Sequence, residues 1–186
     1  AWYENDGAAD PSWTAADIAT SADGAISVFA ADMDGDGDID IVSASTNDWT
    51  VAWYENNGAA NPAWTASNIV TNAVYTQSVF AADMDGDGDM DIISGNKDTD
   101  MIAWYKNNGA SNPSFTKISI ENKSDYATSV FAADIDGDGD MDIVSAIQND
   151  GTIAWYENDG AANPSWTAAD IATSADGAVS VFAADM

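Results

Sequence analysis

Aspartate residues with the spacing of a metal-binding loop recur along the chain. Residues 32–40 read Asp-Met-Asp-Gly-Asp-Gly-Asp-Ile-Asp, with carboxylates at alternate positions. Like charges held this close repel one another, and a bound cation offsets the repulsion. Calcium is the cation we expect, because it accepts about six to eight oxygen ligands in a flexible shell. The two glycines allow the tight turn that aims the carboxylates at one point.

The loop is part of a repeat. It recurs at residues 83–91 and 134–142, and a fourth copy begins at Asp185 and runs to Met186. The copies step by 51 residues, and so do the Ala-Trp-Tyr segments that begin at Ala1, Ala52, Ala103 and Ala154. Acidic runs are often solvated surface or disordered tails, but copies in fixed register with fixed glycines disfavour that interpretation. We therefore expect three complete calcium sites and a fourth loop truncated at Asp185-Met186.

Composition excludes several classes of function. The net charge is -28 and the basic residues are four lysines, so we expect neither nucleic-acid binding nor docking to anionic membranes. Histidine and cysteine are absent, which removes the usual general base, zinc ligands and disulfides. No apolar run approaches the roughly 18 residues of a membrane span, so we expect no membrane insertion.

Four short strands are predicted in each repeat. In the second repeat they cover residues 78–82, 90–94 and 101–105, and the fourth strand is represented by 64–70 of the repeat before. Asn-Asn-Gly after the third strand is a hairpin signal. Four antiparallel strands every 40–50 residues or so are typical of β-propeller blades, so the expected fold is all-β. We expect the Trp and Tyr residues to pack blade against blade; a sugar-stacking platform is the alternative.

Residues 27–43, from Ser-Val-Phe-Ala-Ala-Asp to Asp-Ile-Val-Ser, resemble the FG-GAP/VCBS repeat. That repeat builds the calcium-binding blades of integrin α-subunit propellers and of many bacterial surface proteins, and the Ala-Trp-Tyr-Glu-Asn segment is similar to the bacterial version. The resemblance covers the whole chain. It implies that the first, second, third and fifth aspartates of each loop give carboxylate oxygens and the fourth its backbone carbonyl. The implied calcium ligands are Asp32, Asp34, Asp36, Asp38, Asp40, Asp83, Asp85, Asp87, Asp89, Asp91, Asp134, Asp136, Asp138, Asp140 and Asp142.

An EF-hand is the nearest competing motif. Its twelfth position should hold a glutamate that binds calcium with both oxygens, but Ser43, Ser94 and Ser145 stand there. The EF-hand interpretation therefore fails.

The repeats divide the chain into blades. We expect a partial blade at 1–24 (strands three and four), complete blades at 25–76, 77–127 and 128–178, and the first strand of a further blade at 179–186. Three blades do not close a ring, so we expect further blades from a longer chain or from another copy. By resemblance the ring has seven blades. Six are suggested because 154–186 matches 1–33 except at two positions, and eight stay open.

Comparison of the repeats with one another separates two kinds of loop. The aspartate loop and the Asn/Asp-Gly hairpin hardly change, whereas residues 45–49, 96–100 and 147–151 and the connections at 72–76 and 122–126 vary. Alternate connections of an up-and-down blade share a side, so the variable loops should lie opposite calcium. Variation there fits relaxed drift or a binding surface. The candidate ligand-binding residues are Trp49, Tyr75, Lys97 and Tyr126.

The expected function is a calcium-stabilised extracellular interaction or adhesion module, secreted or on the cell surface, that binds a protein or glycan opposite calcium. The alternative is a calcium-containing propeller lectin with glycan pockets between blades. We expect no enzyme, because the clustered carboxylates repeat identically and all belong to the aspartate loops.

Overall fold

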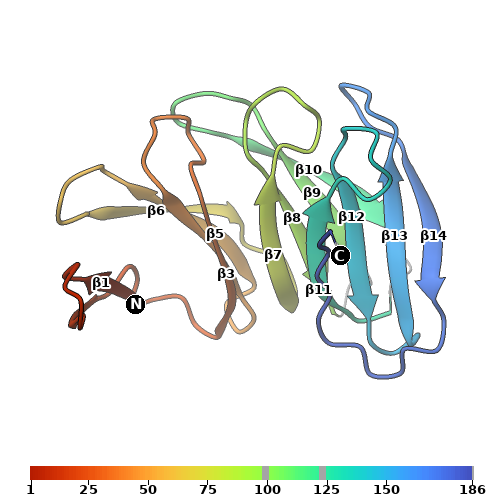
Figure 1. Cartoon of the computed structure of the whole chain (residues 1–186), viewed down its shortest axis with the longest axis horizontal. Coiled ribbons are helices and arrows are strands. Elements are labelled where there is room, and N and C mark those ends of the chain that lie inside the picture. The colour runs from red at the N-terminus through yellow and green to blue at the C-terminus, as the bar shows by residue number, and fades with distance from the viewer. Residues whose placement is uncertain (98–100, 122–124, 186) are drawn as a thin grey trace.

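The computed structural model describes residues 1–97, 101–121 and 125–185, which form strands, turns and loops (Figure 1). Three four-stranded antiparallel sheets and one two-stranded sheet are present in these ranges, and each sheet follows chain order. The strands are β1 (Trp2–Asn5), β2 (Trp13–Ala16), β3 (Ala25–Ala31), β4 (Asp40–Ser45), β5 (Thr50–Asn56), β6 (Trp64–Val70), β7 (Thr76–Ala82), β8 (Asp91–Asn96), β9 (Met101–Asn107), β10 (Phe115–Glu121), β11 (Ala127–Ala133), β12 (Asp142–Ile147), β13 (Thr152–Asn158) and β14 (Trp166–Ala172).

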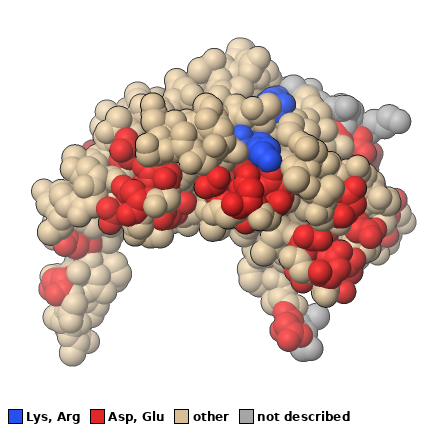
Figure 2. Space-filling view, turned by 90° about the horizontal axis from the view of Figure 1, so that it is seen from above, with Lys and Arg blue, Asp and Glu red and all other residues tan. Residues whose placement is uncertain are grey.

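The sheets are blades of a β-propeller, as the repeat pattern predicts. They stand side by side in an open arc that does not close (Figures 1 and 2). The second strand of each blade is buried along almost its whole length, because neighbouring blades cover both of its faces. A strand covered on both faces shows a continuous apolar or small-residue run in place of alternation, as in the Ile-Ile-Ser-Gly run of β8.

The first strands of the blades form the inner wall of the arc. β7 lies against β3 and β4, and β11 lies against β7 and β8. A ladder of phenylalanine rings crosses these strands, with centroids 4.3 Å apart for Phe29 and Phe80 and 4.7 Å apart for Phe80 and Phe131. The ladder continues from Phe131 to Phe182, also at 4.7 Å. Tilted ring pairs at this spacing are favourable, so the ladder joins successive blades.

Hydrogen bonds also run from blade to blade along the inner strands. A serine hydroxyl on each first strand accepts from the N–H of a valine in the next repeat, at 3.1–3.2 Å. The small side chain lets the two backbones approach, and its oxygen satisfies an N–H that no ladder partner reaches. The donor–acceptor pairs are Val79–Ser27, Val130–Ser78 and Val181–Ser129.

The large aromatic residues of the third and fourth strands fill the junctions between blades. Trp53 and Trp104 are 2% and 1% exposed, and the ring of Trp104 meets that of Trp166 edge-on at 6.3 Å. Trp53 belongs to the same packed cluster as Phe115 of the next blade. The expectation that these aromatics pack blade against blade is confirmed at both junctions.

Small differences from the expected elements have local causes. β7 and β11 begin one residue before the expected blade boundaries. β8 begins at Asp91, one residue after the start of the strand expected at 90–94, because Met90 still belongs to the loop. Residues 179–185 form no strand, since no described segment pairs with their backbone, although they lie beside β11 through Val181 and Phe182. Met186 lies outside the described residues. The described ranges contain no helix long and apolar enough to cross a membrane.

An asparagine at the end of the third strand fastens each of the last two blades to the loop of the blade before. The Nδ2 group of Asn107 donates to Met90 O within its own blade, at 3.0 Å, and to Met33 O of the preceding blade, at 2.9 Å. Asn158 repeats both bonds, to Met141 O and Met84 O. Asn56 makes the bond within its blade, to Ile39 O at 3.1 Å.

The two kinds of asparagine give a matched test of this junction. Asn107→Ala should lower the free energy of unfolding by about 1–3 kcal/mol more than Asn56→Ala, because it leaves a buried carbonyl of the preceding blade unsatisfied. Both variants lose the same bond to the hairpin glycine, so the difference between their denaturant midpoints isolates the bond between blades. Equal losses would show that this bond does not stabilise the junction.

Candidate metal centres and the opposite face

Each aspartate loop connects the first strand of a blade to the second, and its first carboxylate shapes the turn. Asp32 Oδ1 accepts from Gly35 N at 2.8 Å and its Oδ2 accepts from Gly37 N at 2.9 Å. Both glycines have positive φ, 75° and 95°, which explains their constancy among the repeats. Asp134 holds Gly137 and Gly139 in the same way.

The last aspartate of each loop is a buried clamp between strands. Asp40 is fully buried, and its two oxygens accept from Met33 N at 3.0 Å and Asn56 N at 2.8 Å. These bonds join the end of the first strand, the start of the second and the end of the third. Asp91 and Asp142 make the corresponding pairs of bonds.

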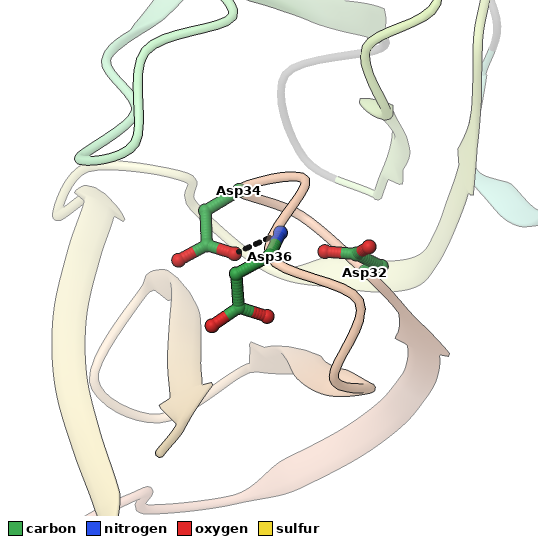
Figure 3. A group of neighbouring side chains, drawn as sticks. All are labelled: Asp32, Asp34 and Asp36. Atoms are coloured by element: carbon green, nitrogen blue, oxygen red, sulfur yellow. Dashed lines mark hydrogen bonds between the residues drawn. The ribbon is translucent and has the colours of Figure 1, made fainter. Parts of the chain in front are cut away.

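Carboxylates gather into a cluster at the centre of each loop. In the first loop, one carboxylate oxygen each of Asp32, Asp34 and Asp36 lies within 4.8 Å of the others, and Figure 3 shows the three groups around one space. Asp34 Oδ1 also accepts from Asp36 N at 3.2 Å. The other clusters are Asp83, Asp85 and Asp91, and Asp134, Asp136 and Asp138.

The proximity of these groups is visible in their ionisation. Burial raises the pKa of Asp34, and the charges of Asp36, Asp40 and Asp32 raise it further. Loss of hydration and four neighbouring carboxylates likewise raise the pKa of Asp140. Asp34 and Asp140 therefore bind their protons more tightly than an isolated aspartate does.

Burial also raises the pKa of Asp91, to about 6, although the N–H groups that it accepts from lower it. The unfolded value is 3.8, so the folded, cation-free protein binds this proton more tightly than the unfolded chain. Stability from this group therefore falls as the pH rises from about 4 to about 6. A nearby cation opposes the shift, because it favours the ionised form.

The hairpin between the third and fourth strands lies against the aspartate loop. A Cβ atom on Gly58 would stand 2.0 Å from Asp38 Oδ2, and Gly109 and Gly160 meet Asp89 and Asp140 at almost the same distance. Gly7, at the same position of the partial blade, has nothing within 4 Å. The hairpin glycine is therefore required by contact with the loop as well as by its positive φ.

Acidic residues consequently gather on one side of the molecule, here called the aspartate face. It comprises the aspartate loops and the hairpins at 57–63, 108–114 and 159–165. In Figure 1 the aspartate loops lie along the upper edge of the view, and the hairpin at 57–63 lies at its left. Figure 2 looks onto this face and shows separate acidic clusters along the arc, one of them bordered by a basic patch. Lys106 forms an ion pair with Asp85 in the second loop.

The predicted ligands are thus placed in three groups. Carboxylates of the first three aspartates cluster in the first and third loops, the fourth packs on the hairpin, and the fifth clamps the strands. In the second loop Asp91 replaces Asp87 in the cluster. The assignment of individual aspartates as calcium ligands stays a prediction.

The four candidate ligand-binding residues form one row on the opposite side, here called the variable face. The rings of Trp49 and Tyr75 are 6.5 Å apart. Lys97 Nζ lies 5.9 Å from the centroid of Tyr75 and 4.3 Å from that of Tyr126, so it links the two tyrosines. Residues 98–100 and 122–124 of the variable loops lie outside the described residues.

Each aromatic residue of the row has a left-handed backbone. The φ angles are 58° at Trp49, 52° at Tyr75 and 72° at Tyr126. Among the equivalent positions, Gly151 matches Trp49, whose other equivalent is Asp100, and Gly24 and Gly177 match the tyrosines. A side chain in this conformation costs about 1–2 kcal/mol. The chain therefore carries aromatics at positions where its own repeats show that glycine suffices.

Comparison with known proteins identifies these repeats. The architecture is that of β-propeller blades with an acidic loop after the first strand. The model of the FG-GAP-like repeat matches residues 32–94, 83–145 and 134–186, and the chain belongs to this family. Such repeats form propeller-type interaction modules and are generally non-catalytic. No curated protein matches the chain.

Sequence reasoning missed three features of these sites. The ion pair of Lys106, the contact of Asp38 with the hairpin glycine and the left-handed conformation of the aromatics were not predicted. Signals existed for the first and third, since the equivalents of Lys106 are glutamates and those of Tyr75 include glycines. The contact of Asp38 with Gly58 had no such signal, because the sequence does not state which side chain a hairpin touches.

Substitution of the hairpin glycine tests its contact with the loop. Gly58→Ala should lower the free energy of unfolding by about 1–3 kcal/mol more than Gly35→Ala, because it adds overpacking against Asp38 to the cost of positive φ. Gly35 is the matched control, with φ +75° and nothing within 4 Å of an added Cβ. Urea midpoints of the two variants measure the difference, and equal midpoints would contradict the contact.

Proposed function

We propose that the chain is a calcium-stabilised interaction module of a secreted or cell-surface protein, and that it binds a protein partner on the variable face. The observation that carries the partner site is the row of Trp49, Tyr75, Lys97 and Tyr126. Membership of a family of interaction modules supports the class of function.

The donor set of the aspartate loops fits calcium. A cluster of carboxylates, in which the pKa of Asp34 is raised by burial and neighbouring charges, favours a cation, and hard oxygens without nitrogen or sulfur donors suit calcium or magnesium. Asp85 adds a separate observation: its side chain is buried, and its Oδ1 has no hydrogen-bond partner among the described residues. An unpaired buried carboxylate oxygen is costly, and a bound cation removes that cost.

The choice of calcium over magnesium follows from the flexibility of the loop. Magnesium demands a nearly ideal octahedron and retains water, whereas calcium accepts irregular oxygen shells. The loops carry glycines with open space around them, which permits such adjustment. Extracellular calcium is millimolar, a concentration that fills modest sites, and this supports a secreted or surface location.

The row on the variable face has the properties of a protein-binding surface. Trp49 and Tyr75 are 44% and 38% exposed, and Lys97 lies between two tyrosine rings. Exposed aromatics give large contact areas at low entropic cost and are frequent among interface hot spots. Their left-handed backbones add a cost that packing of the blade does not require, since other repeats carry glycine there.

Rigid backbone contacts hold the row in place. Tyr75 O accepts from Lys97 N at 3.1 Å, and Trp49 O accepts from Ala73 N at 2.9 Å. The residues therefore project from loops that are fastened to one another across a blade junction. Such preorganisation reduces the entropy lost on binding.

A glycan-binding propeller remains the second candidate. A groove of about 300 Å³ lies between the first two blades and is lined in part by Asn68 and Ser114. Trp53 also lines this groove, but its ring is buried in the junction between the blades, which leaves little ring surface for a sugar to stack on. We therefore favour the protein partner on the variable face.

Replacement by the residues of the chain's own repeats tests the binding surface. The double variant Trp49→Gly, Tyr126→Gly should lose at least about tenfold in affinity for proteins captured from a native cell-surface extract, since it removes two anchors. Its free energy of unfolding should stay within about 1 kcal/mol of the wild type, because relief of left-handed strain offsets the entropy of added glycine. Quantitative pull-down and thermal melts measure both.

Met141→Ala serves as the control, because Met141 is 37% exposed on the aspartate face and should leave binding unchanged. Retained binding by the glycine variant, or equal loss in both variants, would contradict the proposed surface. Hits on a glycan array that a free monosaccharide competes for, and that Trp64→Ala abolishes, would assign the chain to the lectin candidate.

A further inference from the structure

We propose that Lys106 supplies a built-in cation to the second aspartate loop, so that this loop binds calcium more weakly than the first and third loops. The inference rests on the proposed calcium function and adds an inequality among its three sites. It concerns a residue at the end of the third strand, outside the loops.

The ammonium group of Lys106 occupies the acidic cluster of the second loop. Its Nζ pairs with the carboxylate of Asp85 and lies 3.6 Å from Asp87 Oδ2. It also donates to Ala162 O, at 3.4 Å, in the hairpin of the third blade. The side chain of Asp85 is fully buried and that of Lys106 is 29% exposed, so solvent screens this pair only in part.

The other repeats carry the opposite charge at this position. Glu55 and Glu157 are the equivalents of Lys106 in the first and third blades, and Glu4 is the equivalent in the partial blade. A cation therefore reaches this position in the second blade alone among the four copies. Loop sequences are otherwise the same at every aspartate and glycine, so Lys106 is a single difference with a direct route to the site.

The second loop is rearranged around this ammonium group. In the first and third loops the second carboxylate accepts from a backbone N–H two residues later, Asp36 N to Asp34 and Asp138 N to Asp136, each at 3.2 Å. In the second loop the N–H of Asp87 donates instead to Asp83 Oδ1, at 3.1 Å.

The carboxylate cluster changes with these bonds. Asp87 is replaced in the cluster by the buried Asp91. Of the two carboxylates near the ammonium group, Asp85 stays in the cluster and Asp87 lies outside it. One bond of the other loops is kept in the second loop, between Gly88 N and Asp83 Oδ2, which are 2.9 Å apart.

Competition between the two cations sets the expected affinity. A divalent ion in the second loop must displace the ammonium group from Asp85 or share the carboxylates with it at short range, and both options oppose binding. Breaking one charge-assisted bond of Lys106 corresponds to a dissociation constant for calcium in the second loop that is about 10- to 100-fold higher. The first and third loops meet no such competitor within the described residues.

Calcium titration of matched variants tests the inference. Isothermal titration calorimetry and native mass spectrometry of the wild-type chain should show two tighter sites and one that is about 10- to 100-fold weaker. Lys106→Glu restores the residue of the other repeats, and Lys106→Met removes the charge. Each variant should raise the calcium affinity of the second loop to that of the first and third loops. Glu55→Lys should convert the first loop into a second weak site.

Three equal sites in the wild type, or unchanged titrations in both Lys106 variants, would overturn the inference and leave the calcium function standing. No binding at any loop would overturn the calcium function itself, and with it the inference. Circular dichroism of each variant confirms that the blades are folded before titration.

Chemical labelling supplies a test that needs no variant. The rate of acetylation of Lys106, followed by mass spectrometry, should be low without calcium. It should stay low at calcium concentrations that fill only the first and third loops, and it should rise several-fold when the second loop fills. Lys117, on β10, is the internal reference. A labelling rate that does not change across the whole titration would contradict displacement of the ammonium group.

Discussion

Repulsion among the carboxylates of each aspartate loop is the constraint on which the rest of the blade depends. Backbone N–H groups offset part of it: Asp32 accepts from two glycines, and the buried Asp40 accepts from the ends of two other segments. These bonds leave the central oxygens facing one another, and burial together with the neighbouring charges raises the pKa of Asp34. The proposed calcium ion would offset this repulsion, and in the second loop an ammonium group lies close to two of the carboxylates.

The same loops link the structure beyond their own blade. Asp40 joins three strand ends, Asp38 lies against Gly58 of the hairpin, and Asn107 reaches back to Met33 O in the loop before it. Since each blade touches its neighbour through such contacts, loosening one loop weakens the junction with the next blade.

Much of the fold was predictable because the repeat is regular. A period of 51 residues, strand-like runs and Asn/Asp-Gly turns were enough to predict four-stranded blades and the burial of Trp104 between them. Alternation of connections predicted two faces, and Trp49, Tyr75, Lys97 and Tyr126 do lie together. The strands, turns and alternation of connections depend on residues close together in the sequence, so the sequence was enough to predict them.

The features that escaped prediction depend on contacts between distant segments. Lys106 is 21 residues from Asp85 along the chain, and only the register of β8 with β9 brings its side chain to the loop. The strand expected at 179–186 requires a partner for its backbone, which the described segments do not provide. The left-handed backbones of the aromatics are likewise set by hydrogen bonds between loops, such as Lys97 N to Tyr75 O.

A calcium-dependent thermal melt tests the central claim most directly. The melting temperature of the chain should fall sharply on chelation with EDTA and return with calcium but not with an equal ionic strength of sodium chloride, which screens charge without filling a site. A site that binds only the folded state adds about 2.7 kcal/mol at a calcium concentration a hundredfold above its dissociation constant. Asp36→Asn should reduce the calcium-induced rise. The same melting temperature in EDTA and in calcium, or full recovery with sodium chloride alone, would contradict the account.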